Sequence, residues 1–295
     1  MGNQLWTSPV TGIRRRGTKL IELRKHFESS ITVEAIYEPL QSCPVDSNPE
    51  EVVNVLTQRG FDVCGIKESS TFDIHRYVST SSLKSAGSIA DVAYPILSSN
   101  LVSEKTALAD ALQILAEDHW KFVLVGSSVG GIITQWDFNK PPARVYFFGI
   151  LSLFEQHLNL WLQSAHTERE IKNLVGVDKY QRAKSIQGQK RSRGISTSLV
   201  DNFDIGDKQI LLVQSKDTLQ LLEIDEEYLG FMENIVRFRN ALMHAASTVL
   251  DEMEWSDVAG LICSIEGLLI KSDHVIEQNA LRRKERDSEH LVVSA

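Results

Sequence analysis

The stretch FVLVGSSVGGIITQWD, residues 122–137, decides how this chain folds, and it allows two interpretations. Gly126, Ser128 and Gly130 follow the spacing G-x-S-x-G, in which a strand, a sharp turn and a helix present the serine as a nucleophile. Alternatively, two short strands are joined by a glycine turn and followed by T-x-x-D, which ends at Asp137. The first interpretation makes the protein an esterase and the second makes it a nucleotide sensor.

The residues after the turn favour the second interpretation. The segment GGIIT carries β-branched residues, which continue as a strand rather than as a helix. A serine hydrolase also needs Asp and His at the ends of later strands, and no series of strands is predicted downstream. We therefore expect Ser128 to lie in a strand hairpin rather than at an α/β-hydrolase nucleophile elbow.

The order strand, helix, strand, strand, helix occurs twice before residue 147, about 55 residues apart. The first copy comprises ITVEAIYEPL (31–40), EEVVNVLTQRG (50–60), FDVCGI (61–66) and HRYVSTSSL (75–83). Asn48 followed by Pro49 is typical of a helix N-cap, and Ser103 is the N-cap that we expect in the second copy. An internal repeat of this kind is stronger evidence for a fold than any single segment.

This tandem repeat, residues 31–147, resembles a pair of CBS domains. The resemblance depends on FDVCGI and HRYVS in the first copy and on residues 100–138 in the second, which end in the family's G-h-h-T-x-x-D pattern. Such pairs commonly bind adenosine-containing ligands between the two modules, with the Asp carboxylate on the ribose hydroxyls and the Thr hydroxyl on the sugar or phosphate. The resemblance thus implies an adenine nucleotide as regulatory ligand, with Thr134 and Asp137 as ligand-binding residues.

A second role for Asp137 is equally open, because Asp often caps the helix that follows it. The first copy departs from the family pattern, since Ser82 stands where the carboxylate is expected. We therefore expect one nucleotide site per pair.

The pattern changes after Pro141-Pro142. Nearly every stretch from 147 to about 280 has helical periodicity, and no proline follows residue 142, which predicts an all-α domain. An amphipathic helix is also expected at residues 18–29.

The sequence RFRNALMHAA (237–246) is the sharpest motif of this second half. Its spacing R-N-x-x-x-H resembles the signature of HEPN domains, small helical bundles that often act as metal-independent ribonucleases. The context also fits the family: a helix with Glu155, a basic stretch and a segment from Asn202 to Lys208 precede the motif. The resemblance implies a homodimer with a composite groove, an RNA substrate, no cofactor required for catalysis and no metal, in toxin or phage-defence settings. It names Arg239, Asn240 and His244 as catalytic residues.

Elementary chemistry agrees with this assignment. RNA supplies its own nucleophile, the 2′-hydroxyl, so that a protein has to provide only proton transfer and stabilisation of phosphate charge. Histidine, with an ordinary pKa of about 6.5, suits the first task, and the planar guanidinium of arginine suits the second. Asn240 and His244 fall on neighbouring turns of one helical face. Arg239 is about 140° away from His244, whereas Arg237 is close to its face and is an accessory candidate.

A basic segment precedes this motif. KYQRAKSIQGQKRSR (179–193) holds six Lys or Arg and no acidic residue, although the whole chain has a net charge of −8. We expect Lys190, Arg191 and Arg193, together with Arg237, to contact RNA. The alternative is a solvated loop, which is the usual environment of a charge run.

Composition excludes several classes. The net charge of −8 argues against a protein that coats nucleic acid through its overall field. The three cysteines are scattered and give neither a disulfide framework nor zinc spacing, so we expect a cytoplasmic protein. The N-terminus does not resemble a secretory signal, and the longest apolar run is about half of a membrane span, so we expect no membrane partner.

The predicted fold class is α+β multidomain: an α/β CBS pair followed by an all-α HEPN-like helical bundle. The predicted parts are an N-terminal helical arm (1–30), the tandem module (31–147), the helical bundle (148–280) and a flexible tail (281–295). The function hypothesis is a nucleotide-sensing endoribonuclease that needs no metal. The alternative is a non-catalytic regulator that binds nucleotide and whose helical domain mediates dimerisation and partner docking.

Overall fold

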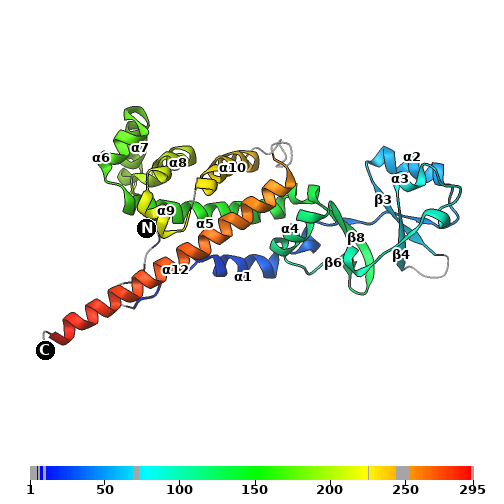
Figure 1. Ribbon diagram of the computed structural model, residues 1–295, viewed down its shortest axis with the longest axis horizontal. Coiled ribbons are helices and arrows are strands. Elements are labelled where there is room, and N and C mark those ends of the chain that lie inside the picture. The colour runs from blue at the N-terminus through cyan, green and yellow to red at the C-terminus, as the bar shows by residue number, and fades with distance from the viewer. Residues whose placement is uncertain are drawn as a thin grey trace. The chain divides into compact units, whose positions relative to one another are not determined.

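The computed structural model describes residues 5, 7–8, 11–68, 73–224, 226–243 and 253–293, without the side chains of 226–229 and 281–293 (Figure 1). The chain forms two compact units. Phe27–Arg144 make one, here called the inserted unit, and Met1–His26 with Val145–Ala295 make the other, called the helical unit. One unit is therefore an insertion into the sequence of the other.

The inserted unit contains two four-stranded sheets with the orders β1-β8-β7-β6 and β2-β3-β4-β5. Its strands are β1 (Glu38–Pro39), β2 (Ser42–Pro44), β3 (Val63–Lys67), β4 (Ile74–Ser79), β5 (Tyr94–Pro95), β6 (Leu101–Ser103), β7 (Trp120–Val125) and β8 (Ser128–Thr134). Its helices are α2 (Pro49–Arg59), α3 (Thr80–Leu83) and α4 (Leu108–Glu117), with short 3₁₀ turns η1 (Val33–Ala35), η2 (Ala90–Val92), η3 (Ser98–Asn100) and η4 (Gln135–Asn139).

The two repeats exchange their first strands. Strand β1 of the first repeat pairs antiparallel with β8 of the second, and β5 of the second pairs antiparallel with β4 of the first. Within each sheet the remaining pairs are equivalent, because β2–β3 and β6–β7 are parallel whereas β3–β4 and β7–β8 are antiparallel. Each sheet is thus complete only when both repeats are folded.

Most of the predicted local structure of the inserted unit is confirmed. The hairpin of β7 and β8 replaces the nucleophile-elbow geometry, and Asn48 caps α2 by accepting from the amide of Glu50, with proline in the first turn. The predicted N-cap Ser103 is wrong, because this residue ends strand β6 and α4 begins only after Ala107. The predicted strand over 31–40 is largely wrong, since a 3₁₀ turn occupies its centre and only two residues pair.

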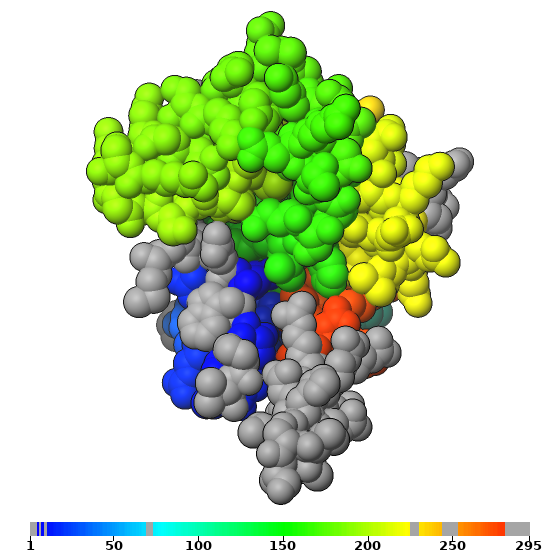
Figure 2. All heavy atoms as spheres, turned by 90° about the vertical axis from the view of Figure 1, so that its left-hand side faces the viewer, coloured from blue at the N-terminus to red at the C-terminus, as the bar shows by residue number. Residues whose placement is uncertain are grey.

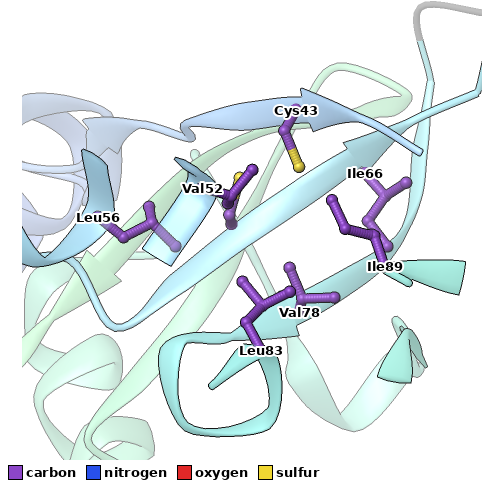
Figure 3. Close-up of a cluster of buried hydrophobic side chains, with 8 residues drawn as sticks. Cys43, Val52, Leu56, Ile66, Val78, Leu83 and Ile89 are labelled. Carbon is purple, nitrogen blue, oxygen red and sulfur yellow. The ribbon is translucent and has the colours of Figure 1, made fainter. Parts of the chain in front are cut away.

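The core of the first repeat lies between β2–β3–β4 and the helices α2 and α3 (Figure 3). Its buried side chains are Cys43, Val52, Leu56, Cys64, Ile66, Val78, Leu83 and Ile89. In the second repeat, α4 buries Leu108, Ala111, Leu112 and Leu115, which is the apolar face that its periodicity predicts.

A glycine makes the strand exchange between β1 and β8 possible. Gly131 pairs with Pro39 across the β1–β8 ladder, and the Tyr37 ring lies over it. A Cβ atom at residue 131 would lie 2.3 Å from Cδ2 of Tyr37 and 3.1 Å from the carbonyl oxygen of Glu38. Any side chain at this position would therefore push β1 away from its partner.

The helical unit consists of one short 3₁₀ turn and eight described helices, two of which, α1 and α5, cross the unit boundary. These are α1 (Leu20–Ser30), α5 (Pro141–Ala165), α6 (Glu168–Val175), α7 (Val177–Ser192), η5 (Val200–Asn202), α8 (Ile205–Val213), α9 (Lys216–Leu221), α10 (Glu226–Met243) and α12 (Trp255–Val293). The helix α12 continues through the segment for which the sequence predicts a flexible tail.

Three ion pairs attach the N-terminal segment to α12. Arg14 pairs with Asp273, Lys19 pairs with Glu277 and Arg24 pairs with Glu266. The three acidic residues are spaced by seven and four positions, which places them on one face of α12. Figure 2 shows the N-terminal residues, in blue, beside the orange-red part of α12.

A buried histidine fixes the same attachment from α5. His157 lies with Nε2 3.0 Å from the carbonyl oxygen of Thr18 and with Nδ1 2.7 Å from the hydroxyl of Ser272. Trp161 donates to the same hydroxyl from its indole nitrogen, 2.7 Å away. Burial lowers the pKa of His157 to about 4, and the nearby Arg14 adds to this effect, against the opposing contributions of Thr18 and Asp273.

We predict that Gly131→Ala destabilises the inserted unit by about 1–3 kcal/mol, because the added methyl group overlaps Tyr37 and the β1 backbone. Urea denaturation of the full chain measures the change. The control is Gly87→Ala, where a Cβ atom meets nothing within 4 Å and little change is expected. Equal stabilities of the two variants would contradict this account of the strand exchange.

The pKa of His157 predicts a pH dependence of stability. The unfolded chain takes up a proton near the ordinary pKa of 6.5 and the folded chain only near 4, so stability falls as pH decreases through this window. We expect His157 to contribute a loss of roughly 2 kcal/mol between pH 6.5 and 5. The free energy of unfolding at several pH values tests this. His157→Gln should flatten the slope and the exposed control His119→Gln should not; identical slopes would refute the prediction.

Candidate functional site

The T-x-x-D motif closes the end of strand β8. The carboxylate Oδ2 of Asp137 accepts from the amide of Thr134 at 2.7 Å and from its hydroxyl at 3.0 Å. Asp137 is only 6% exposed. In this arrangement the carboxylate holds the turn η4, which is the capping role that the sequence leaves open beside ligand binding.

Lys140 connects this motif to the exchanged strand. Its ammonium group lies 2.8 Å from Oδ1 of Asp137 and also contacts the carboxylate of Glu38 and the carbonyl oxygen of Ile36. Burial lowers the pKa of Lys140, but the bonds to Asp137 and Glu38 outweigh it, so that the pKa is raised overall. The second repeat's motif is thus linked by charge to a strand of the first.

The equivalent place in the first repeat has the same geometry without the charge. Ser79 ends β4 as Thr134 ends β8, and its hydroxyl accepts from the amide of Ser82 at 3.1 Å. In return, the amide of Ser79 donates to the Ser82 hydroxyl at 3.2 Å. The two repeats therefore build the same turn, and only the second places a carboxylate in it.

Four aromatic rings from both repeats meet beside these strand ends. The Tyr77 ring lies 5.6 Å from Tyr94, 5.5 Å from Trp120 and 5.1 Å from Phe122, measured between ring centroids. Trp120 pairs with Thr134 across the β7–β8 ladder. Phe122 is buried, whereas Trp120 and Tyr77 are half-buried and Tyr94 is exposed, so that the cluster offers aromatic surface beside the motif.

Ser128, the residue of the competing hydrolase interpretation, lies at the start of β8. Gly126 has φ +62° in the hairpin turn, and the chain continues as a strand. The hydroxyl of Ser128 donates to Asp73 at 2.7 Å. This is a strand–turn–strand arrangement, which does not present the serine as an α/β-hydrolase does.

In the helical unit, α10 packs antiparallel against α5 through aromatic side chains. Phe238 meets Phe147 at a centroid distance of 5.3 Å, and Phe231 meets Phe154 at 6.1 Å. The buried ridge of α10 also includes Met232 and Ile235. These contacts fix the rotation of α10 about its axis and hence the direction of its remaining side chains.

The predicted catalytic residues Arg239 and Asn240 and the accessory candidate Arg237 are exposed on α10. At about 100° per residue, Arg237 and Arg239 lie on opposite flanks of the ridge through Phe238, and Asn240 lies on the side away from α5. His244 lies outside the described residues.

The basic segment 179–193 is mainly helical, because α7 runs from Val177 to Ser192. Three of its six cations form ion pairs: Lys179 with Asp207, Arg182 with Asp204 and Asp207, and Lys184 with Glu168. The other three are the predicted RNA contacts Lys190, Arg191 and Arg193, of which the last two are exposed. The pairs neutralise the first half of α7 and leave positive charge at its C-terminal end.

The structure does not bring the two groups of candidate RNA contacts together. Helix α7 packs against α6 and η5, whereas α10 packs against α8 and α12. In Figure 1, α8 lies between α7 and α10. The end of α7 is therefore a separate surface within one copy of the chain.

An ion pair of a buried lysine links α8 to α5, two helices that pack against α10. Lys208 on α8, 1% exposed, pairs with Glu155 on α5, and the adjacent Asp207 pairs with Lys179 and Arg182 of α7. The segment from Asn202 to Lys208, which contributes to the HEPN resemblance, thus connects α8 to both neighbouring helices.

Sequence reasoning missed Lys140, Glu38 and the aromatic cluster as parts of the candidate site. Lys140 follows the motif by three residues, so its i, i+3 spacing to Asp137 was a usable signal. The aromatic rings gave none, because the exchanged pairing of β5 with β4 brings Tyr94 to Tyr77, and packing between the two sheets brings Trp120 and Phe122 to it.

The chain is similar in structure to solved CBS-domain proteins. A CBS domain-containing protein from Bacillus anthracis str. Ames Ancestor matches 39% of this chain and 93% of its own, at 14% identity and a TM-score of 0.33. CBSX2 in complex with AMP matches 36% of this chain and 91% of its own, at 19% identity and a TM-score of 0.31. The CBS domain of a bacterial CNNM/CorC family Mg²⁺ transporter in complex with ATP matches 42% of this chain and 94% of its own. The identity is 14% and the TM-score is 0.32.

No family model matches the chain, and no curated protein matches it. Within the described residues, no cluster of three or more His, Cys, Asp or Glu side chains could hold a metal ion. Over the same residues, every helix is too short or too polar to span a lipid bilayer.

Proposed function

We propose that this protein is a nucleotide-sensing ribonuclease, in which the inserted unit binds an adenine nucleotide and the helical unit cleaves RNA without a metal. Nucleotide binding by the inserted unit is supported by its exchanged pair of sheets, with a T-x-x-D motif at the end of β8. The ribonuclease half rests on the R-N-x-x-x-H motif and on the exposure of Arg239 and Asn240.

The nucleotide would use groups that the second repeat already holds in place. The carboxylate of Asp137 would accept from the two ribose hydroxyls, and Thr134 would contact the sugar or phosphate. The half-buried Trp120 and the exposed Tyr94 offer ring faces on which a purine can stack. Lys140 supplies a cation for phosphate, and its move from Asp137 to the ligand would release the carboxylate for the ribose.

This exchange of partners suggests how binding would be sensed. Lys140 contacts Glu38 and Ile36 as well as Asp137, and it is followed at once by the first residue of α5. A ligand that draws Lys140 away from these groups would alter the start of the helix that carries Phe147 and Phe154. Those two residues pack against α10, so a shift at the start of α5 would reach the helix that carries Arg239.

Arg239 would hold the scissile phosphodiester and stabilise its developing charge, and His244 would transfer protons to and from the reacting oxygens. The 2′-hydroxyl attacks the adjacent phosphorus, the 5′-oxygen leaves with a proton, and the product ends in a 2′,3′-cyclic phosphate. Asn240 would orient the phosphate or the histidine by hydrogen bonding. Arg237 and the end of α7 would hold more distant phosphates of the RNA.

A second copy of the chain is expected to complete the groove. Phe148 and Met243 are each more than half exposed, and Phe148 lies on the same flank of the α5–α10 pair as Arg239. Exposed apolar side chains beside a charged motif favour a protein interface at this face. The same observation favours the alternative function, in which the helical unit docks a partner and cleaves nothing.

We predict that Asp137→Ala weakens adenine-nucleotide binding about 100-fold, because two hydrogen bonds to a charged acceptor are lost. Isothermal titration calorimetry with AMP, ADP and ATP measures the affinity. Ser82→Ala is the matched control, since it removes the equivalent cap in the first repeat without removing a carboxylate, and it should keep the wild-type affinity. Unchanged affinity in Asp137→Ala would exclude this site.

We also predict that the purified chain cleaves RNA in the presence of EDTA, and that His244→Ala lowers kcat/KM at least 100-fold through loss of proton transfer. Arg239→Ala should have an effect of similar size. The exposed Arg169 on α6 provides a control, and Arg169→Ala should remain active. A mixed RNA pool with and without adenine nucleotides, read by the 2′,3′-cyclic phosphate ends, gives the measurement.

Failure of this experiment separates the two candidate functions. If the wild type binds nucleotide and dimerises but leaves every RNA intact, the helical unit is a docking module. If the Arg169→Ala variant is as inactive as the Arg239→Ala variant, the loss reflects folding and not the site.

A further inference from the structure

Two of the three cysteines lie on adjacent strands in the core of the first repeat. Cys43 is the middle residue of β2 and Cys64 is the second residue of β3, and these strands run parallel. The ladder pairs Cys43 with Ile66, two positions beyond Cys64. Because side chains alternate along a strand, Cys43, Cys64 and Ile66 point to the same face of the sheet.

The two thiols interact with each other. Both belong to the same buried cluster, where α2 covers them with Val52 and Leu56 (Figure 3). The neighbouring Cys64 thiol lowers the pKa of Cys43, whereas the neighbouring Cys43, together with burial, raises the pKa of Cys64. Cys64 also donates to the carbonyl oxygen of Gly65 at 3.4 Å. The directions of these two shifts favour Cys43 as the sulfur that ionises first.

A cavity reaches both sulfur-bearing residues. It has a volume of about 230 Å³ and lies between α2 and the β2–β3 edge. Polar residues including Ser47, Glu51 and Arg59 line it together with the two cysteines. Cys43 is 8% exposed and Cys64 3%, so bulky reagents are excluded, whereas the volume is several times the roughly 30 Å³ of one water molecule.

We propose that Cys43 and Cys64 are a peroxide-oxidisable pair, which forms an intramolecular disulfide when a small hydroperoxide enters this cavity. The Cys43 thiolate attacks the peroxide, the O–O bond breaks, and the sulfur becomes a sulfenic acid while water or an alcohol leaves. The Cys64 sulfur then displaces the sulfenic hydroxyl as a second water. In total, two thiols lose two hydrogens and the peroxide is reduced, so that no further reactant is required.

The competing account is that both residues are inert core packing. Free cysteine is among the most buried residue types and behaves as a small apolar side chain. Under that account the two thiols resist peroxide in the folded chain, and the cavity has no chemical role. The experiment below distinguishes the two, because it measures a covalent bond.

The test uses the full chain carrying Cys263→Ser, which removes the exposed third thiol. After treatment with hydrogen peroxide under native conditions, we expect the intact mass to fall by about 2 Da and a Cys43–Cys64 linked peptide to appear after digestion. Addition of dithiothreitol should restore both thiols. If both thiols remain free to alkylation, or if either gains oxygen without linkage, the proposal is wrong.

Single variants identify the role of each sulfur. In Cys64→Ala, Cys43 should stop at the sulfenic acid, which adds the mass of one oxygen, about 16 Da, to its peptide. In Cys43→Ala, the peptide that carries Cys64 should keep its mass. Equal oxidation of the two cysteines would refute the assignment of Cys43 as the attacking sulfur. Circular dichroism of each variant checks that it is folded, and the mass measurement on the Cys263→Ser chain stands independently of them.

Discussion

The pairing of β1 with β8 is the constraint on which the inserted unit depends. It brings a strand of the first repeat against the strand that ends in Thr134, and its companion pairing of β5 with β4 does the converse. Neither exchanged strand has more than two paired residues, so each needs close backbone contact, which Gly131 permits beneath the Tyr37 ring. The contacts of Lys140 with both Asp137 and Glu38, and the contact of Tyr77 with Tyr94, follow from these pairings.

The two repeats of the inserted unit have the same backbone geometry at the end of their last long strand, but their side chains there differ in charge. Ser79 with Ser82 and Thr134 with Asp137 form equivalent turns, but only the second has a charge that must be balanced. Lys140 balances it, so that the buried carboxylate is not left unpaired. The duplicated scaffold thus contains one turn that requires a cation and one turn that does not.

Local features were predictable from the sequence, and long-range ones were not. The β-branched run after Gly130 and the Asn48-Pro49 pair determine structure through their own backbone preferences, so they were read correctly. The predicted N-cap at Ser103 was wrong because the residue type of a cap does not reveal that the residue ends a strand. The exchanged strands, the aromatic cluster and the Arg14–Asp273 pair, 259 residues apart in sequence, are set by tertiary packing. The motifs themselves were visible, and the partners that hold Asp137 were not.

The insertion of one unit into the other has a consequence for biosynthesis. Everything that completes the inserted unit lies before Val145, so it can fold while the ribosome is still translating the rest. Arg14, Lys19 and Arg24, in contrast, find their partners Asp273, Glu277 and Glu266 only after α12 has been translated. A product that ends before α12 would therefore contain a complete inserted unit and an unfinished helical unit.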